Sequence, residues 1–261
     1  MKTSMAEIIR RTKARLLRMH FESGVGHIGG NLSALDMILY LHHRELGADD
    51  VFLLSKGHAA GALYAALWSL GRLTDDDLSQ FHREGTRLSG HPAPGWRADI
   101  PFATGSLGHG LSLACGLALG KKLKKEQGRV FCLLSDGEWN EGSTWEGLIF
   151  AAHHGLDLTA LVDLNGLQGF GATADVADLD PLAEKIRAFG ADVRIIDGHK
   201  TDELAAALAR RAKGPRVIVA RTVKGHGVSF MENKMEWHYL PMTENQYRLA
   251  LAEIGASAEA A

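Results

Sequence analysis

The sequence is poor in several features that would point to special environments. It has only two cysteines, Cys115 and Cys132, both inside apolar segments, so reduced core thiols are expected rather than a disulfide framework. Its formal net charge is −2, which gives no reason to expect nucleic-acid or membrane partners. No apolar run approaches the ~18 residues of a membrane span, and the Arg-rich N-terminus lacks the apolar region of a signal peptide. No repeat, low-complexity tract or interior linker interrupts the chain. These absences predict a cytoplasmic protein with one domain over residues 1–261.

Hydrophobic periodicity and turn residues predict an α/β chain. The expected strands are 51–54, 130–134, 158–162, 192–196 and 216–221, and the expected helices are 5–20, 34–44, 111–125, 143–154, 182–189, 202–212 and 243–254. A glycine-rich loop over 23–30 is expected to precede helix 34–44, with Ser33 as its cap. The tail, 255–261, is expected to fray. We predict a doubly wound sheet of about five or six mainly parallel strands with helices on both faces.

The stretch richest in candidate chemistry is residues 130–171. An apolar run breaks into Ser135-Asp136-Gly137, a helical segment follows, and a second apolar run, 158–162, breaks into Asp163-Leu164-Asn165-Gly166. A right-handed crossover would put the two strands side by side, so Asp136 and Asn165 would emerge at the carboxyl edge where α/β sheets bind ligands. A carboxylate, a carboxamide and a nearby main-chain carbonyl suit Mg²⁺ or Ca²⁺, with phosphate oxygens and water completing the shell. A surface Asp and a turn Asn at strand ends are the alternative on the loops alone.

This stretch resembles the thiamine diphosphate motif, in which an Asp-Gly pair and a later Asn flank a crossover. Here the pair is Asp136-Gly137, and twenty-seven residues separate it from Asn165. The resemblance implies that Asp136, Asn165 and the main-chain carbonyl of Leu167 hold Mg²⁺, with Ca²⁺ or Mn²⁺ as alternative ions. That ion clamps the diphosphate of the cofactor. Ser135 stands where such proteins usually have glycine, a small-for-small change.

Further motifs resemble the transketolase family in particular. Glu141-Gly142 with Trp145-Glu146 follows the metal loop, and five other segments match family motifs. These are Ser23 to Gly30 with its His27, Leu54-Ser55-Lys56-Gly57-His58-Ala59, Gly90-His91-Pro92, Thr104-Gly105-Ser106-Leu107-Gly108-His109-Gly110, and Lys224-Gly225-His226-Gly227 with Trp237-His238. His109 replaces the family's usual Gln. Taken singly, each segment also fits a buried turn histidine, a helix N-terminus or a charged surface loop.

The resemblance implies a role for each matching residue. His27 and His238 would handle protons and oxygens at C2 and C3 of a ketose, while His58 and His91 would hold its C1 hydroxyl. Neutral imidazole suits proton transfer near neutral pH. The implied cofactor contacts are His58, Gly105, Ser106, Leu107, Gly137, Glu141, Asn165, Lys224 and His238. Glu141 is also expected at a subunit interface.

The resemblance covers about residues 5–245 but matches only the diphosphate-binding domain of a full-length transketolase, a thiamine diphosphate-binding fold. The pyrimidine-binding and C-terminal domains are expected to be absent, together with the glutamate that protonates the aminopyrimidine ring. Glu138, Glu141 and Glu146 are expected beside the metal loop, at the wrong end of the cofactor to replace it. The resemblance therefore implies the N-terminal subunit of a two-subunit transketolase, active only with a separate C-terminal subunit in an α₂β₂ heterotetramer. It would transfer a two-carbon ketol unit between sugar phosphates, from a ketose donor to an aldose acceptor.

Three alternatives compete with this interpretation. Half of a 1-deoxyxylulose-5-phosphate synthase would share the fold, cofactor and metal loop, but the Ser-Lys-Gly-His and Trp-Glu-Gly segments favour transketolase. A non-catalytic scaffold subunit of the same fold is disfavoured by the intact metal and histidine sets. A dinucleotide-binding domain would need G-x-G-x-x-G after the first strand of a βαβ unit, and the chain has no such arrangement.

Overall fold

The computed structural model describes residues 3–209 and 214–256. Within them lies one five-stranded, fully parallel sheet with the order β1-β2-β3-β5-β4. The strands are β1 Val51–Leu54, β2 Val130–Ser135, β3 Leu158–Leu164, β4 Asp192–Asp197 and β5 Arg216–Arg221. The predicted doubly wound parallel fold is confirmed. Residues 210–212 of predicted helix 202–212, and 257–261 of the predicted frayed tail, lie outside the described part.

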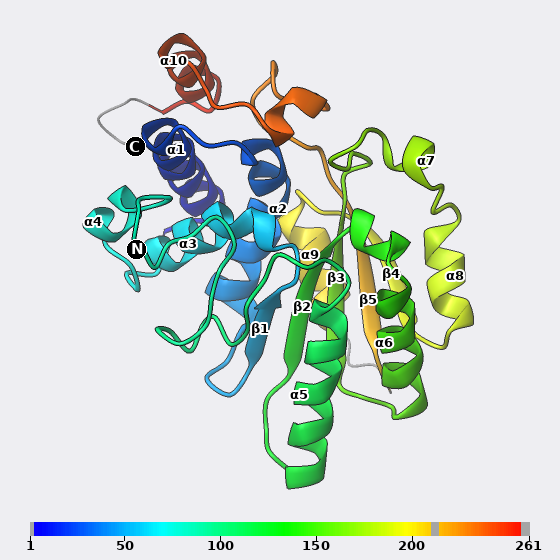
Figure 1. Ribbon diagram of the computed structural model, residues 1–261. Coiled ribbons are helices and arrows are strands. Elements are labelled where there is room, and N and C mark those ends of the chain that lie inside the picture. Colours follow the sequence, from blue (N-terminus) through cyan, green and yellow to red (C-terminus); the bar gives the residue numbers. More distant parts are fainter. Residues whose placement is uncertain (1–2, 210–213, 257–261) are drawn as a thin grey trace.

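Helices cover both faces of the sheet (Figure 1). The core on one face includes α2 Ile28–Tyr40, α3 Ala60–Ser69 and α9 Thr201–Ala209. Helix α1 Met5–Ser23 packs on α2 and α3, and α10 Glu244–Glu253 packs on α1. The other face packs against α5 Gly110–Lys124, α6 Gly142–His153 and α8 Leu182–Ala188. The short helices are α4 Asp75–Ser79, α7 Thr173–Val176, a π-helical turn Leu41–Glu45, and 3₁₀ turns Gly57–Ala59, Gly137–Asn140 and Met235–His238. Burial on both faces explains why the central strands read as continuous apolar runs.

The predicted start of the second helix is wrong. Helix α2 begins at Ile28, and its N-cap is His27 in the left-handed region, at φ 66°. Gly29 and Gly30 are typical of loops in the sequence, yet both lie in the first helical turn, and the Lys224 side chain packs closely against Gly29. A Cβ on Gly29 would lie 3.1 Å from Cγ of Lys224. Ser33 is therefore inside the helix rather than its cap, and its hydroxyl is used elsewhere.

Two further predictions can be compared with the structure. Cys115 and Cys132 are both buried and unpaired, as expected for reduced core thiols. No helix within the described residues combines the length and the apolar character that crossing a bilayer requires.

Candidate functional site

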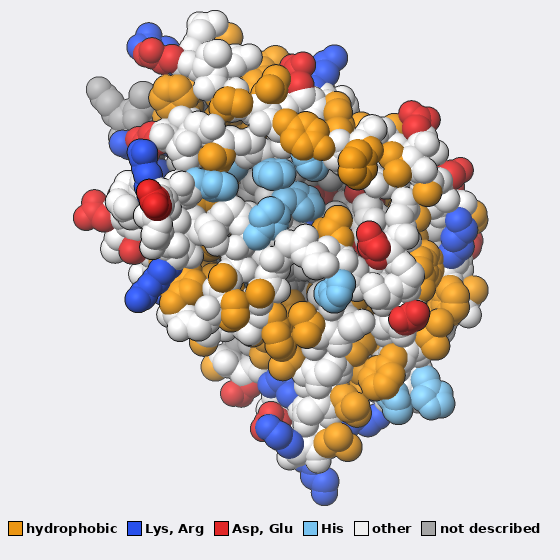
Figure 2. Space-filling model, in the orientation of Figure 1, with side chains coloured by type: hydrophobic (Ala, Val, Ile, Leu, Met, Phe, Trp, Pro, Cys, Tyr) orange, Lys and Arg blue, Asp and Glu red, His pale blue; other side chains and the backbone are white. Residues whose placement is uncertain are grey.

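A cleft opens at the carboxyl edge of the sheet, where the loops that follow β1, β2, β3 and β5 meet the first turn of α2. The residues predicted from the family motifs line it together, apart from Ser106 and Glu141. Figure 2 shows histidine side chains gathered around this hollow. Parallel strands aligned in register, with Ser135 paired to Asp163, explain why segments distant in sequence end at one place. We call this cavity the cleft below.

The oxygen-rich floor of the cleft is built around Asp136. Its carboxylate is 2% exposed and accepts hydrogen bonds from the N–H groups of Gly137 (2.8 Å) and Gly166 (2.8 Å) and from the hydroxyl of Thr173 (3.0 Å). Burial, with the nearby Asp163 charge, raises the pKa of Asp136 above its usual value despite these donors. Among the described residues, no basic side chain lies within ion-pair distance of Asp136. A buried carboxylate without a cationic partner fits a bound metal ion.

The other two predicted metal ligands follow β3. Asn165 Oδ1 accepts the N–H of Leu167 (3.1 Å), and the carbonyl of Leu167 accepts a hydrogen bond from Nζ of Lys224 (3.3 Å). Both residues line the cleft with Asp136, so the donor set consists of hard oxygens. These three residues could hold Mg²⁺, and Lys224 brings a positive charge beside them.

Four histidines face one another across the cleft. The ring centroid of His27 lies 5.0 Å from that of His238, 5.8 Å from that of His58 and 6.1 Å from that of His91. Burial is the main reason that the pKa of His27 falls to about 4 and that of His238 to about 3. Burial also lowers the pKa of His58 and of His91. All four rings are therefore neutral near pH 7, the form that accepts protons.

Lys224 fixes the tautomer of His238. Its side chain is buried, and burial followed by the charge of Lys56 lowers its pKa to about 8. Nζ of Lys224 donates to Nδ1 of His238 at 2.9 Å. Because an ammonium group can only donate, Nδ1 of His238 carries the lone pair and Nε2 carries the proton. The His238 ring therefore offers an N–H donor from its other nitrogen.

A buried ion pair beneath the cleft was not predicted from the sequence. The side chains of Lys56 and Asp163 are both 0% exposed and in direct contact. Asp163 also accepts the hydroxyls of Ser33 (2.6 Å) and Thr222. One carboxylate on β3 thus holds together helix α2 and the loops after β1 and β5. The sequence predicted a strand that ends at Val162, just before Asp163, whereas β3 continues through Asp163 to Leu164.

A second buried carboxylate connects three segments at the edge of the cleft. Glu138 is 0% exposed and accepts the hydroxyl of Ser55 and the N–H groups of Gly108 (3.1 Å) and Ser135 (2.9 Å). Burial raises its pKa. The sequence predicted Glu138 beside the metal loop, but its donors come from the loop after β1, the end of β2 and the segment 105–110, and this grouping could not be foreseen. Glu138 aligns the ends of β1 and β2 with the segment 105–110.

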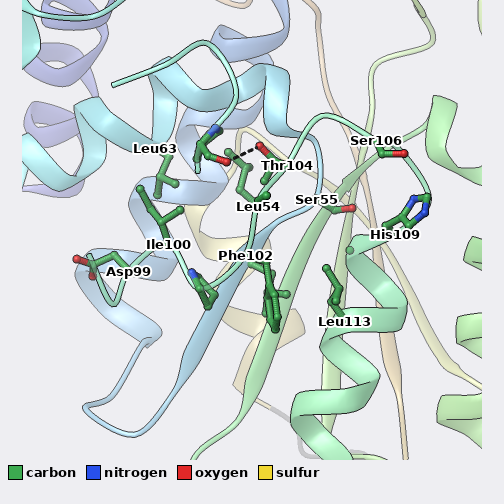
Figure 3. Close-up of a pocket in the computed structure, with 15 residues that line it drawn as sticks. Leu54, Ser55, Leu63, Asp99, Ile100, Phe102, Thr104, Ser106, His109 and Leu113 are labelled. Atoms are coloured by element: carbon green, nitrogen blue, oxygen red, sulfur yellow. Dashed lines mark hydrogen bonds between the residues drawn. The ribbon is translucent and has the colours of Figure 1, made fainter. Parts of the chain in front are cut away.

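The side chains of Ser106 and Glu141 do not line the cleft, although Gly105 and Leu107 on either side of Ser106 do. Ser106 lines a separate, mostly apolar pocket under residues 99–110, with His109 also at its edge (Figure 3). His109, which replaces the family's Gln, turns back on its own loop, with Nδ1 3.0 Å from the carbonyl oxygen of Leu107. Glu141 is exposed beside Gly108, where an added Cβ would lie 2.7 Å from Cβ of Glu141. The cofactor contacts of Ser106 and Glu141 therefore stay a prediction.

Comparison with known proteins agrees with this geometry. The family described as transketolase, thiamine diphosphate binding domain, matches residues 13–260. The chain is 40% identical over 244 residues to the 6-deoxy-6-sulfo-D-fructose transketolase subunit SqwG of Clostridium sp. (strain MSTE9), covering 88% of this chain and 89% of that one. It is 36% identical over 261 residues to an apulose-4-phosphate transketolase subunit of Actinobacillus succinogenes, covering 95% and 94%.

The solved structures match over a larger protein. The transketolase from Leishmania mexicana superposes with a TM-score of 0.90 at 25% identity, covering 98% of this chain but only 42% of that one. Fold, family match and relatives agree over nearly the whole sequence. The chain therefore belongs to the transketolase family, in which it corresponds to the thiamine diphosphate-binding domain.

Proposed function

We propose that this chain is the N-terminal subunit of a two-subunit transketolase that moves a two-carbon ketol unit from a ketose phosphate to an aldose phosphate. The observation that carries the proposal is the cleft itself. It joins an oxygen donor set, a buried lysine and four neutral histidines at the carboxyl edge of one sheet. An oxygen set suits Mg²⁺, and neutral histidines suit proton transfer at a sugar carbonyl.

The residues of the cleft would have different roles in binding and catalysis. When bound, thiamine diphosphate supplies the electron sink for breaking the bond next to the ketose carbonyl. Asp136, Asn165 and the Leu167 carbonyl would hold Mg²⁺, with Ca²⁺ or Mn²⁺ as substitutes, and Lys224 would add positive charge at the diphosphate. The histidines would bind and orient the sugar.

Two of the histidines are suited to moving protons. His238 offers Nε2–H, because its Nδ1 is occupied by Lys224, so it would donate to a sugar oxygen. His27, neutral and 5.0 Å from His238 between ring centroids, would take up the proton of a sugar hydroxyl. His58 and His91 would hold the C1 hydroxyl.

We propose that a separate C-terminal subunit completes the site. The two relatives matched over 89% and 94% of their own length are each named as a transketolase subunit. The rim of the cleft also carries exposed aromatic side chains, with Phe170 90% and Tyr239 57% exposed, which favours a partner surface over open water. The partner would bring the glutamate that protonates the aminopyrimidine, in an α₂β₂ heterotetramer in the cytoplasm.

The substrates are proposed at the level of their class. The two relatives are named for 6-deoxy-6-sulfo-D-fructose and for apulose 4-phosphate, so related subunits differ in the sugar they act on. For this chain we propose a phosphorylated or similarly anionic ketose donor.

Co-expression with a candidate C-terminal subunit tests the proposal. The purified complex should have the mass of an α₂β₂ heterotetramer by light scattering and should catalyse ketol transfer only with thiamine diphosphate and Mg²⁺. The chain alone should show no turnover. Full turnover by the chain alone would refute the two-subunit proposal, and a complex that binds the cofactor without turnover would favour a scaffold.

A further inference from the structure

Backbone hydrogen bonds fix the loop that carries Lys224 into the cleft. Residues 222–227 follow β5, and four of their backbone N–H groups donate to atoms outside this segment. The acceptors are the carbonyl of Leu164 for Thr222 (3.1 Å), Nε2 of His199 for Val223 (2.9 Å), the carbonyl of Gly29 for Gly225 (2.9 Å) and Oε1 of Glu232 for Gly227 (2.9 Å). Two of these acceptors are side chains, and Glu232 lies only five residues further along the same connection. His199 is therefore the side-chain anchor that comes from a different part of the fold, and it binds the residue next to Lys224.

The hydrogen bonds of His199 fix its tautomer. Because Nε2 accepts the Val223 N–H, Nε2 carries the lone pair and Nδ1 carries the ring proton. Nδ1 lies 2.7 Å from Oδ2 of Asp36, a residue of α2 that is 2% exposed. The His226 ring stacks on the His199 ring, with centroids 3.5 Å apart and an interplanar angle of 20°. Asp36, His199 and Val223 thus form one hydrogen-bonded chain from helix α2 to the loop.

A metal site is the alternative interpretation of the carboxylate and the two stacked histidines. Asp36, His199 and His226 offer ligand atoms that all lie within 4.8 Å of one another. However, a metal ion at Nδ1 of His199 would move the ring proton to Nε2, where it would face the N–H of Val223. Nζ of Lys13 also donates to the His226 carbonyl (3.1 Å), so a positive charge already lies beside the group. The geometry favours a hydrogen-bonded anchor over a cation site.

We propose that His199, held by Asp36, is a positioning residue that sets the place of Lys224 in the cleft through the N–H of Val223. This rests on the proposed function, in which Lys224 lies at the cofactor diphosphate. The N-terminal end of helix α2 reaches the cleft, because its N-cap residue His27 and its residue Gly30 both line the cavity. The anchor therefore fixes the lysine loop relative to the helix that begins at His27.

The first test needs neither cofactor nor partner. In the ¹⁵N spectrum of the full chain, His199 should show the tautomer protonated at Nδ1. Hydrogen exchange at Val223 should accelerate about fivefold in His199→Phe, because a neutral hydrogen bond stabilises by about 1 kcal/mol. Phenylalanine keeps the ring that stacks on His226. His199→Gln, whose amide oxygen can accept the N–H, should restore most of the protection.

A buried histidine outside the cleft serves as the matched control. His42 packs its ring against Phe52 with a centroid distance of 5.1 Å, and its Nε2 has no hydrogen-bond partner, so His42→Phe should leave exchange at Val223 unchanged. If His199→Phe does not fold, Asp36→Asn provides a milder change and should raise exchange by about threefold. The opposite tautomer, or unchanged exchange in every His199 and Asp36 variant, would overturn the proposal.

The second test asks whether His199 acts through Lys224. Calorimetry on the complex with its partner would measure the affinity for thiamine diphosphate in the presence of Mg²⁺. Lys224→Met should weaken binding, and adding His199→Phe should change it by less than about twofold, since coupled residues are not additive. Additive losses would overturn the proposal. If the wild-type complex bound no cofactor, the proposed function would fail, while exchange at Val223 would still decide the anchor.

Discussion

Removing Lys56 should destabilise the fold strongly, although the residue lies under a ligand cleft. Its ammonium group is fully buried against Asp163 and also donates to the Gly30 carbonyl at 3.1 Å. Burial raises the pKa of Asp163, but the charge of Lys56, with the hydrogen bonds to the carboxylate, outweighs burial and holds the pKa below its usual value. Lys56→Met therefore leaves a buried carboxylate without its cation.

The size of the effect follows from the groups that remain. Breaking a buried pair by removing one partner costs about 3–5 kcal/mol. The hydroxyls of Ser33 and Thr222 still donate to Asp163, so we expect the lower end, about 3 kcal/mol. Domain stabilities are about 5–15 kcal/mol, so the variant should still fold, with a much smaller margin.

Urea unfolding at pH 7 measures this loss. The double variant Lys56→Met with Asp163→Asn should be more stable than Lys56→Met alone, because the uncompensated charge is gone. Lys124→Met is the control, since its ion pair with Glu126 is 72% exposed on the lysine side, and it should change stability by less than about 0.5 kcal/mol. A loss under about 1 kcal/mol in Lys56→Met, or a double variant less stable than the single one, would refute the reasoning.

The remaining predictions concern the cleft and acid stability. Asp136→Ala should abolish calorimetric binding of thiamine diphosphate and Mg²⁺ by the complex while circular dichroism stays native; unchanged affinity would reject the metal assignment. His27→Ala and His238→Ala should each lower turnover by roughly 10²–10⁴-fold with much smaller effects on cofactor affinity, and losses under about threefold for both would exclude proton transfer. Burial lowers the pKa of His42 to about 4, so below its usual 6.5 the unfolded chain binds a proton that the folded chain does not. As the pH falls from 6.5 to 4, this group should therefore lower the free energy of unfolding by up to about 1.4 kcal/mol per pH unit. Urea titrations at pH 7, 6 and 5 should show a shallower decline of stability in His42→Phe than in the wild type. Parallel declines would show that His42 does not have a lowered pKa in the folded chain.

Short sequence patterns were enough to predict the position of residues that directly follow adjacent parallel strands. Asp136 and Asn165 end strands joined by one crossover, so adjacent strands bring them to one edge regardless of the rest of the fold. The predicted helix start is wrong because glycines are typical of loops, whereas Gly29 lies in the helix in close contact with the Lys224 side chain. Propensity describes the chain alone and cannot report such a contact.

Buried polar networks were the larger omission. Lys56 and Asp163 are 107 residues apart, and His199 and Asp36 are 163 apart. Each residue taken alone is an ordinary charged or polar side chain, and its partner is chosen by the fold. The residues that line the cleft could therefore be predicted from the sequence, but the buried hydrogen-bonded residues that position them could not.

The carboxylate of Asp163 also limits how sequences of this kind can diverge. Three donors from separate segments, at positions 33, 56 and 222, share it, so a change at any one of the four positions removes a buried partner from the others. These positions should change together or not at all during evolution. Phe170, by contrast, is 90% exposed at the rim. A directed-evolution library seeking a new sugar preference should randomise the rim and leave those four positions untouched.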